Sequence, residues 1–334
     1  MHVWQIPSFG LEALEFVERP TPAPGAGEVL VRVRAVSFNY RDLLLVKGLY
    51  NPKLKLPRIP CSDGAGVVEA VGPGVTQWKS GDRVAGIFMQ NWLDGPPTPA
   101  NVKGALGGDV DGMLAEFVVL HESGLVAVPQ SFDFLQASTL PCAAVTAWNA
   151  LKVGQARAGS TVLVQGTGGV SVFAIQMAKA MGARVLGTST HAHKLERALA
   201  LGLDAGLNAA ETPEWSNWVL EQTGGAGVDL VVEVGGAGTL QQSLQAVRMG
   251  GVVAQIGVLS GVSSQVSVPL VLHKQVRLQG IYVGSRSDFE EMNAFLAQTG
   301  LQPVVEGFPW EGSREVLRKM ESQGHFGKLA VVIG

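Results

Sequence analysis

The regular alternation of short apolar runs with helix-length segments between residues 124 and 265 constrains the fold more than any other feature. The apolar runs are nearly continuous, which is typical of strands in a parallel sheet that is covered by helices on both faces. The pattern therefore predicts a doubly wound α/β unit. Its predicted strands and helices follow one another as 161–164, 170–181, 184–187, 192–201, 228–234, 240–248 and 252–256.

A glycine-rich turn joins the first predicted strand of this unit to its first helix. It reads Gly166-Thr167-Gly168-Gly169-Val170-Ser171, with Ser171 in place of a third glycine. Glycines allow a tight turn and let the backbone approach a pyrophosphate, which the amino end of the following helix binds. The position of the motif inside a strand–turn–helix–strand unit predicts a dinucleotide site. An ordinary packing turn is the alternative.

The end of the second predicted strand indicates which dinucleotide binds. NAD sites place a carboxylate there for the ribose 2′-hydroxyl. The stretch 186–194 has no carboxylate and contains Ser189, Thr190 and Lys194, which suit a 2′-phosphate. We therefore predict NADPH, with contacts from Ser189 and Lys194. The alternative is that the two hydroxyls cap the next helix and that Lys194 is a solvated surface residue.

The flanking residues follow a different pattern of short β-branched runs separated by Gly and Pro turns. The run 28–36 alternates at its charged end, and 66–71 and 114–120 are further strand candidates. Frequent turns between alternating strands are typical of an antiparallel, barrel-like domain. We therefore expect residues 1–123 and 266–334 to form a β-rich substrate domain, into which a nucleotide-binding domain at 124–265 is inserted.

Composition excludes several classes of protein. The chain has 25 Lys and Arg against 28 Asp and Glu, so no basic excess favours nucleic acid. Two cysteines, Cys61 and Cys142, are too few for a disulfide framework or an all-cysteine zinc site. The first residues lack the pattern of a signal peptide, and Gly, Ser, Thr and Gln interrupt the uncharged stretches. We expect a cytoplasmic protein with no membrane segment.

Several further motifs resemble those of the medium-chain dehydrogenase/reductase superfamily, and in particular its zinc-free branch of quinone oxidoreductases and enoyl reductases. The resemblance covers essentially the whole chain and implies a Rossmann domain inserted into a GroES-like domain. Besides the glycine motif, the segments that carry it are 24–36, Asn39-Tyr40-Arg41-Asp42, 59–68, Gly81-Asp82-Arg83-Val84, 112–119, Thr146-Ala147-Trp148, 280–286 and Phe326-Gly327-Lys328.

The zinc ligands of other members are missing from the matching positions. Zinc-dependent relatives carry a Cys in the segment that matches 39–42 and Gly-His-Glu where this chain has Cys61-Ser62-Asp63. The loop 92–112, where a structural zinc lobe would fall, has no cysteine. Zinc needs several converging Cys, His or carboxylate ligands. We therefore predict no metal, and a packing role for Cys142.

The resemblance then implies hydride delivery from NADPH to the electrophilic carbon of a quinone or an α,β-unsaturated carbonyl. Such a reaction needs a donor for the developing oxyanion and a proton. Tyr50 matches the proton-donor position of enoyl reductases, and Asn39 stands at the former metal-ligand position. Alternatively, Tyr50 is a wall of the substrate site and Asn39 a turn residue that bonds its own backbone. Arg41 and Asp42 form a local ion pair in this interpretation.

The resemblance also implies further cofactor contacts. Thr146 is expected on the nicotinamide side and Asn208 near the adenosine. Arg286 and Lys328 are expected to contact a phosphate of the cofactor or, alternatively, to form surface ion pairs. The remaining expected contacts are Gly257, Val258, Tyr282 and Val283. The strands 252–256 and 276–283 are expected to pair across the axis of a homodimer.

Two other functions remain open at this stage. One is a zinc-free alcohol dehydrogenase-like enzyme that acts on aldehydes or alcohols. The other is a protein that binds NADPH without catalysis.

Overall fold

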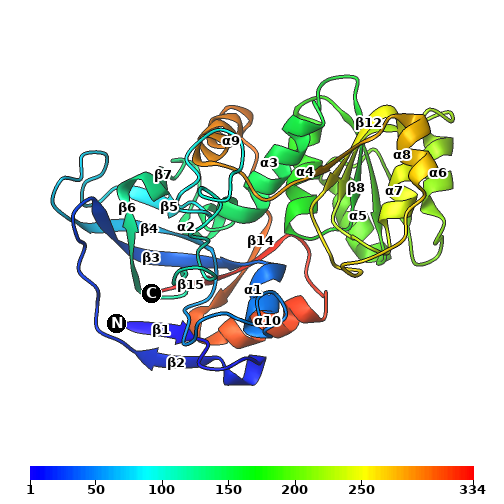
Figure 1. The fold of residues 1–334 in the computed structure, drawn as a ribbon. Coiled ribbons are helices and arrows are strands. Elements are labelled where there is room, and N and C mark those ends of the chain that lie inside the picture. The colour runs from blue at the N-terminus through cyan, green and yellow to red at the C-terminus, as the bar shows by residue number, and fades with distance from the viewer. The chain divides into compact units, whose positions relative to one another are not determined.

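The computed structural model describes residues 1–334, which form two compact units (Figure 1). Unit 1 comprises Met1–Val145 and Gly284–Gly334, and unit 2 comprises Thr146–Val283. The chain leaves unit 1 once and returns to it, so unit 2 is an insertion. The predicted fold class, a parallel α/β unit inserted into a β-rich unit, is confirmed.

Unit 2 contains a six-stranded sheet in which every pair of neighbours is parallel. The strand order is β10-β9-β8-β11-β12-β13, which is the Rossmann order when the strands are counted along the chain. In such a sheet the ligand crevice opens at the carboxyl ends of the strands where the order reverses, here β8 and β11. The strands are β8 (Thr161–Gln165), β9 (Arg184–Ser189), β10 (Ala205–Asn208), β11 (Val228–Glu233), β12 (Val247–Gln255) and β13 (Arg277–Gly280).

Helices connect and cover these strands (Figure 1). Val162, Leu163 and Val164 of β8 are all fully buried, which explains why this strand is continuously apolar. The helices are α3 (Val145–Val153), α4 (Gly169–Ala180), α5 (Ala192–Ala200), α6 (Trp215–Gln222), α7 (Leu240–Ala246) and α8 (Val268–Lys274).

Unit 1 is built on a seven-stranded sheet of order β14-β15-β3-β4-β5-β7, with β6 paired to β3. Only the β14–β15 pair is parallel. The strands are β3 (Glu28–Phe38), β4 (Asp63–Val71), β5 (Arg83–Gly86), β6 (Phe117–His121), β7 (Leu125–Ala127), β14 (Val305–Pro309) and β15 (Lys328–Val332), with a separate hairpin of β1 (His2–Gln5) and β2 (Glu15–Glu18). The helical segments are η1 (Leu11–Ala13), α1 (Tyr40–Val46), η2 (Glu122–Gly124), α2 (Phe134–Ala137), η3 (Leu140–Ala144), α9 (Arg286–Thr299), η4 (Trp310–Gly312) and α10 (Ser313–Glu321).

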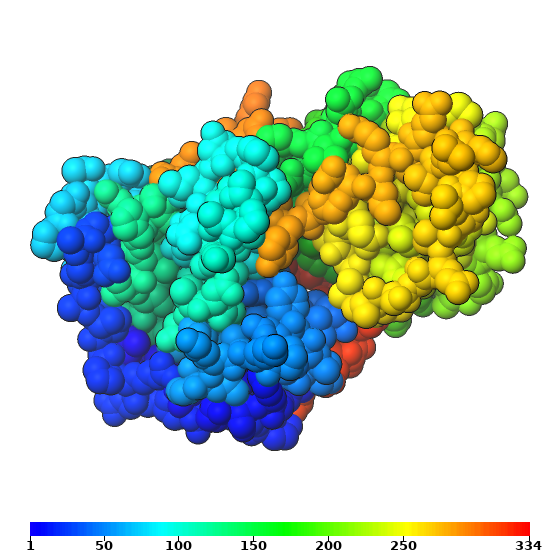
Figure 2. All heavy atoms as spheres, viewed as in Figure 1, coloured from blue at the N-terminus to red at the C-terminus, as the bar shows by residue number.

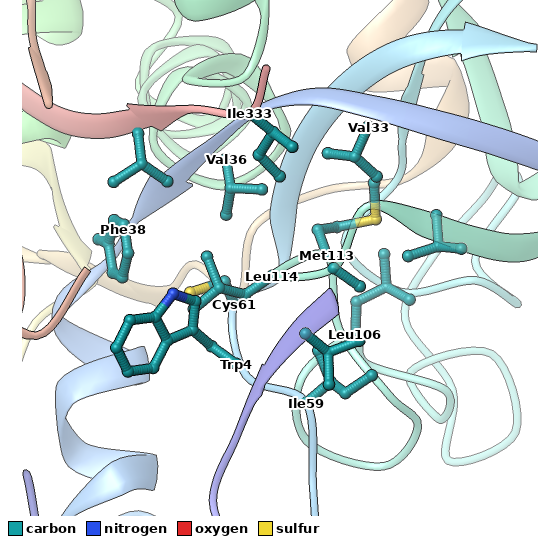
Figure 3. Packing of buried hydrophobic residues seen from close by; sticks show 14 of the residues in the cluster. Trp4, Val33, Val36, Phe38, Ile59, Cys61, Leu106, Met113, Leu114 and Ile333 are labelled. Atoms are coloured by element: carbon teal, nitrogen blue, oxygen red, sulfur yellow. The ribbon is translucent and has the colours of Figure 1, made fainter. Parts of the chain in front are cut away.

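The core of unit 1 lies beside β3 and includes Cys61 (Figure 3). Cys61 is fully buried, and Figure 3 shows it among apolar side chains that include Trp4 and Leu114. Its backbone is left-handed, with φ of 69°. This conformation favours glycine, the residue expected at this position in zinc-dependent relatives. The backbone thus keeps a glycine-like turn directly before Ser62 and Asp63.

The boundaries between the units lie further along the chain than residues 123 and 265. The segment around α2 belongs to unit 1 because the Ser37 hydroxyl of β3 donates to the carbonyl of Ser138, at 2.9 Å. Residues 266–283 belong to unit 2 because β13 pairs with β12. Proximity along the sequence could not show which sheet either segment joins.

Several elements were absent from the predicted set, among them the β1–β2 hairpin, α1, α6, α8, β10 and β14. Strand β10 is only four residues long and includes Gly206, a weak strand former. The structure explains this glycine, since a Cβ there would lie 2.5 Å from the Leu195 side chain of α5.

The loop 92–112 of unit 1, which is rich in Pro and Gly, is closed by hydrogen bonds of its own side chains. Asp109 accepts from the backbone N–H groups of Gly104 and Ala105, at 2.9 and 3.1 Å, and Asn101 donates to the carbonyl of Pro96 at 3.1 Å. This part of the chain contributes to the surface of unit 1, in cyan in Figure 2.

None of the helices combines the length and the apolar character that crossing a bilayer demands.

Candidate active site

The glycine turn of unit 2 has the geometry of an anion site. Gly166 has a φ of 68° and its N–H donates to the carbonyl of Thr188 at 2.7 Å, which closes the turn against β9. Gly168 is the N-cap of α4, and a Cβ on it would meet no atom within 4 Å. Ser171 donates to the carbonyl of Gln165 at 2.7 Å and so fastens the helix to the strand. The turn therefore offers open backbone N–H groups at the start of a 12-residue helix.

A fully buried carboxylate, Glu233, holds the carboxyl ends of β8 and β11 together. Its oxygens accept hydrogen bonds from the end of β8, from the loop after β11 and from residues at the start of α7. The donors are Gln165 Nε2 (2.7 Å), the Gly235 and Gly236 N–H groups (2.8 and 2.9 Å), Thr239 Oγ1 (2.5 Å) and Ser243 Oγ. A buried carboxylate with this many donors is satisfied, and it fixes the loops that line the crevice.

Glu233 was not among the predicted site residues. A carboxylate at the end of an apolar strand, followed by Gly235-Gly236, was the available signal. That signal is weak in a chain with 43 glycines.

The end of β9 brings together several of the residues predicted to select the cofactor. Ser189 is buried and accepts from the His191 N–H at 3.2 Å. His191 is the N-cap of α5 and no side chain caps this helix, so the capping alternative is not what the structure shows. Asn208 of β10 lies opposite Ser189 in register and donates to Glu211 at 2.5 Å. Lys194 is only 5% exposed, and burial, together with nearby Arg197, lowers the pKa of its ammonium. Lys194 is thus not the solvated surface residue of the alternative interpretation.

The other predicted contacts in unit 2 occupy different environments. Thr146 is buried, whereas Val258 and Tyr282 are each nearly half exposed. Gly257 leaves no room for a side chain, since a Cβ would lie 1.9 Å from the carbonyl oxygen of Val234. Val283 has a φ of 58°, a strained conformation for a β-branched residue, and its carbonyl accepts from Asn149 Nδ2 at 3.0 Å.

In unit 1, Asn39 and Lys328 lie in direct contact. Asn39 precedes α1, and its backbone N–H donates to Asp42 at 2.8 Å. Its side chain accepts from Lys328 Nζ at 2.5 Å and donates through Nδ2 to Ser62 Oγ at 3.4 Å. Lys328 is 3% exposed and also donates to the carbonyl of Phe38 at 2.8 Å. The observed partners of Lys328 are therefore all protein groups, and its contact with a cofactor phosphate stays a prediction.

A second buried carboxylate, Asp63, completes this cluster. It accepts from Ser62 Oγ at 2.7 Å, from the Cys142 N–H at 3.3 Å and from Ser37 Oγ at 3.4 Å, and Lys328 Nζ lies 3.6 Å away. The segment that contains Asp63 is among the motifs that carry the family resemblance, but no role was predicted for this side chain. The signal was its match to the Glu of the Gly-His-Glu motif.

The side chains at this position do not fit a zinc ion. Asn39 and Ser62 offer an amide and a hydroxyl, which are not typical zinc ligands, and no group of three or more His, Cys, Asp or Glu side chains converges there with Asp63. Burial, followed by the charge of Asp63, raises the pKa of the Cys142 thiol well above its usual range. The ammonium of Lys328 already supplies a positive charge beside Asp63, and it would repel a second cation.

Tyr50 lies near Arg41. It is 43% exposed, and the Arg41 guanidinium carbon is 5.5 Å from the centre of its ring. The same guanidinium is 4.6 Å from the ring of Phe88 and donates to the carbonyl of Leu106 at 2.8 Å. Arg41 is thus held in place beside an exposed tyrosine, which is compatible with either predicted role of Tyr50.

Arg286, at the start of α9, is engaged within unit 1. Its guanidinium donates to Glu290 at 2.8 Å, to Gln77 at 3.2 Å and to the carbonyl of Ser123 at 3.3 Å. This geometry corresponds to the ion-pair alternative, and a contact with the cofactor stays a prediction.

Two family models match the chain. Residues 25–130 match the alcohol dehydrogenase GroES-like domain, and residues 169–298 match the zinc-binding dehydrogenase family. The first match lies within unit 1, and the second covers most of unit 2 and continues to residue 298 in unit 1.

Known proteins match over nearly the full length. A zinc-type alcohol dehydrogenase-like protein of Schizosaccharomyces pombe is 42% identical over 92% of this chain and 91% of its own. An acryloyl-coenzyme A reductase of Metallosphaera sedula is 30% identical over 89% of each chain. The crystal structure of a putative alcohol dehydrogenase from Sinorhizobium meliloti, 42% identical, superposes with a TM-score of 0.93 over 99% of this chain and 98% of that one. A structure described as an NAD-dependent alcohol dehydrogenase, 35% identical, covers all of both chains with a TM-score of 0.91.

A Rossmann unit inserted into a GroES-like unit, with these relatives, defines an oxidoreductase of the alcohol dehydrogenase-like class. The chain belongs to the medium-chain dehydrogenase/reductase superfamily.

Asp42 generates a prediction about pH and stability. Its side chain is fully buried, Oδ1 accepts no hydrogen bond, and Arg41 lies 3.6 Å away. Burial raises the pKa of Asp42 to about 6 from 3.8, and Arg41 only partly opposes the shift. Between these pH values the folded chain binds more protons at Asp42 than the unfolded chain does. Asp42 therefore contributes less stability as the pH rises through this window.

We predict that Asp42→Asn removes this dependence. The free energy of unfolding of the wild type, minus that of the variant, should fall by roughly 2.5 kcal/mol between pH 4 and pH 7, because one pKa unit corresponds to about 1.4 kcal/mol and the unfolded chain is already partly ionised at pH 4. The asparagine oxygen can still accept from the Asn39 N–H, so the cap at the start of α1 is kept. Urea titrations at four pH values measure the difference, and a difference that does not change with pH would contradict the prediction.

Proposed function

We propose that the protein is a zinc-independent reductase that uses NADPH to reduce quinones or α,β-unsaturated carbonyl compounds. The observation that carries the proposal is the set of side chains at Asn39, Ser62, Asp63 and Lys328. This set provides hydrogen-bond donors and a positive charge but lacks the ligands of a catalytic zinc site. Without a metal to polarise an alcohol oxygen, an already electrophilic carbon is the better partner for hydride.

Unit 2 supports the cofactor part of the proposal. The turn from Gly166 to Ser171 would hold the pyrophosphate at the start of α4, through Thr167, Gly168, Gly169 and Val170. Ser189 and Lys194 would bind the 2′-phosphate, since β9 ends without a carboxylate and Lys194 lies beside Arg197. The contacts proposed for Thr146, Asn208, Gly257, Val258, Tyr282 and Val283 follow the resemblance. When bound, NADPH supplies the hydride.

The side chains of unit 1 would perform the other parts of the reaction. The Asn39 Nδ2–H group donates to the carbonyl oxygen of the acceptor and stabilises the negative charge that develops there. With an enone, the Tyr50 hydroxyl gives a proton to the α-carbon and regains one from water. A quinone needs no such acid, because the hydroquinone oxygens take their protons from solvent.

A second candidate is reduction of aldehydes and oxidation of alcohols. The printed names of several relatives favour it, since those from Schizosaccharomyces pombe and Geobacillus stearothermophilus are described as an alcohol dehydrogenase-like protein and an alcohol dehydrogenase. The name of the acryloyl-coenzyme A reductase favours an activated double bond instead.

An acceptor panel tests the proposed reaction. We expect the purified protein to oxidise NADPH with a quinone and with an enone, at rates that a chelator does not change, and to be at least about tenfold slower with a saturated aldehyde. Tyr50→Phe should slow the enone reaction by about 10²-fold, within the usual range for a general acid, and the quinone reaction by less than about twofold.

Two results would redirect the assignment. Loss of activity with chelator and recovery with Zn²⁺ would contradict the zinc-independent mechanism. Turnover of alcohols with NADP⁺, without turnover of any quinone or enone, would favour the second candidate.

Choice of cofactor is tested at Lys194. Loss of a charged hydrogen bond to phosphate costs about 1.5–3 kcal/mol, so Lys194→Ala should raise the KM for NADPH roughly 10–100-fold. The KM for NADH should change less than about twofold. Lys79→Ala is the control, because the Lys79 side chain is 84% exposed in unit 1. Equal effects on the two cofactors would count against a 2′-phosphate contact.

We also propose that two copies of the chain form a homodimer through the edge of the parallel sheet. All four residues of β13 are exposed, so the strand presents unpaired backbone groups along one side. Exposed apolar side chains accompany this edge, among them Leu278 (46%), Val268 (69%) and Leu272 (69%).

Light scattering tests the dimer. The expected mass is twice 35.0 kDa, and Leu278→Lys should shift the protein towards the monomer because a charge at an edge strand opposes pairing. Val332→Lys, on β15 of unit 1 and 49% exposed in the wild type, is the matched control. A wild-type mass of one chain would overturn the proposal.

A further inference from the structure

The buried ammonium of Lys328 contacts Asn39, at the former metal-ligand position, and lies beside Asp63, which matches the Glu of the Gly-His-Glu motif. Nζ donates to Asn39 Oδ1 at 2.5 Å and to the carbonyl of Phe38 at 2.8 Å, and it lies 3.6 Å from Asp63 Oδ2. The side chain is 3% exposed. A lysine so fully buried among protein acceptors is rare unless its charge has a role in the site.

Contact with Lys328 fixes which way the Asn39 amide faces. An ammonium can only donate, so the carbonyl end of the amide must point to Lys328. Nδ2 then points to the opposite side, where one of its N–H groups reaches Ser62 Oγ at 3.4 Å. The other N–H has no protein partner, and Asn39 is only half buried, so this group is open to a ligand. The charged hydrogen bond at Oδ1 also polarises the amide and strengthens its N–H donors.

Lys328 further compensates the charge of Asp63. This carboxylate is fully buried, and the other groups that bond it, Ser37, Ser62 and the Cys142 N–H, are neutral. Without a cation, the carboxylate would be an uncompensated buried charge directly behind Asn39, and it would weaken any site for a developing oxyanion.

We propose that Lys328 is a positioning residue that supplies the positive charge of this site in place of a metal ion. It holds the Asn39 amide so that Nδ2 donates to the oxygen of the acceptor, and it neutralises Asp63. This inference rests on the proposed reduction of a carbonyl or quinone acceptor. It differs from a contact between Lys328 and a cofactor phosphate, because Lys328 acts through Asn39.

The test compares Lys328→Met, Asn39→Ala and the double variant, with Lys319→Met as the matched control. Lys319 lies on α10 and pairs with Glu306 at the surface. Methionine keeps the length of the lysine side chain but has no charge and no N–H donor. Removing one oxyanion donor costs about 10²–10³-fold in kcat, so we expect a loss of that size in Asn39→Ala and a comparable loss in Lys328→Met.

The double variant should be no slower than the slower single variant, because both substitutions remove the same interaction. The Kd for NADPH, measured by fluorescence without an acceptor, should change less than about threefold in every variant. Lys319→Met should behave as the wild type.

The variant Lys328→Met/Asp63→Asn distinguishes a loss of activity from a loss of folding. Lys328→Met leaves Asp63 unpaired and should lower the Tm by at least about 5 °C, whereas Lys328→Met/Asp63→Asn removes both charges and should regain most of that loss. We expect kcat to stay low in this second variant, because the Asn39 amide is still not anchored. If kcat recovers with stability, Lys328 serves only the charge of Asp63 and the proposal is wrong.

A readout independent of turnover separates this inference from the proposed function. In protein labelled with ¹⁵N-asparagine, the side-chain amide signal of Asn39 is assigned by its loss in Asn39→Ala. Lys328→Met should shift this signal and speed its exchange with water, even if no acceptor is ever turned over. If the wild type reduces no acceptor while the shift occurs, the proposed function fails and the positioning contact stands. An unchanged signal, additive losses in the double variant, or a tenfold rise in the Kd for NADPH with unchanged kcat would each overturn the proposal.

Discussion

Buried carboxylates that accept hydrogen bonds from distant parts of the chain are the constraint on which the candidate functional residues of each unit depend. A carboxylate removed from water must be matched by donors or by a positive charge, and this requirement locks the segments that supply them. Glu233 is matched by neutral donors from β8, α7 and the loop that follows its own strand. Asp63 is matched by hydroxyls, a backbone N–H and the ammonium of Lys328.

The two carboxylates suit different tasks for this reason. Glu233 accepts hydrogen bonds from five neutral donors. It therefore holds the end of β8, the loop after β11 and the start of α7 together at the carboxyl end of the parallel sheet. Around Asp63 the cation lies between the carboxylate and the half-buried Asn39 amide. Under the proposed function, the acceptor therefore meets the N–H donor of Asn39, and the negative charge of Asp63 is balanced by Lys328.

The segment that matches the Gly-His-Glu motif of zinc-dependent relatives combines a glycine-like backbone with different side chains. Cys61 retains the left-handed turn that glycine adopts easily, and β4 still begins at Asp63. The polar groups beside this backbone are the Ser62 hydroxyl, the Asn39 amide and the Lys328 ammonium, which are joined by hydrogen bonds through Asn39. Membership of the alcohol dehydrogenase-like class therefore defines the framework, while the reaction depends on these few side chains.

The local pattern of the sequence indicated the type of both units, a parallel α/β sheet and a mainly antiparallel β unit, but not the boundaries between them. Short apolar runs such as 161–164, followed by a glycine turn and a helix-length segment, favour a strand that is covered on both faces, and β8 is such a strand. Short elements such as β10 were not predicted from the sequence. Gly206 has a weak strand propensity, and its close packing against Leu195 is visible only in the folded chain.

Tertiary structure alone decided which polar side chains meet. Lys328 is separated from Asn39 by 289 residues, and Gln165 from Glu233 by 68. Periodicity reports which face of an element is buried, but it carries no information about the partner of a buried charge. That partner is set by strand register and by the way β3, β4 and β15 lie side by side, so it emerges only when the chain is folded.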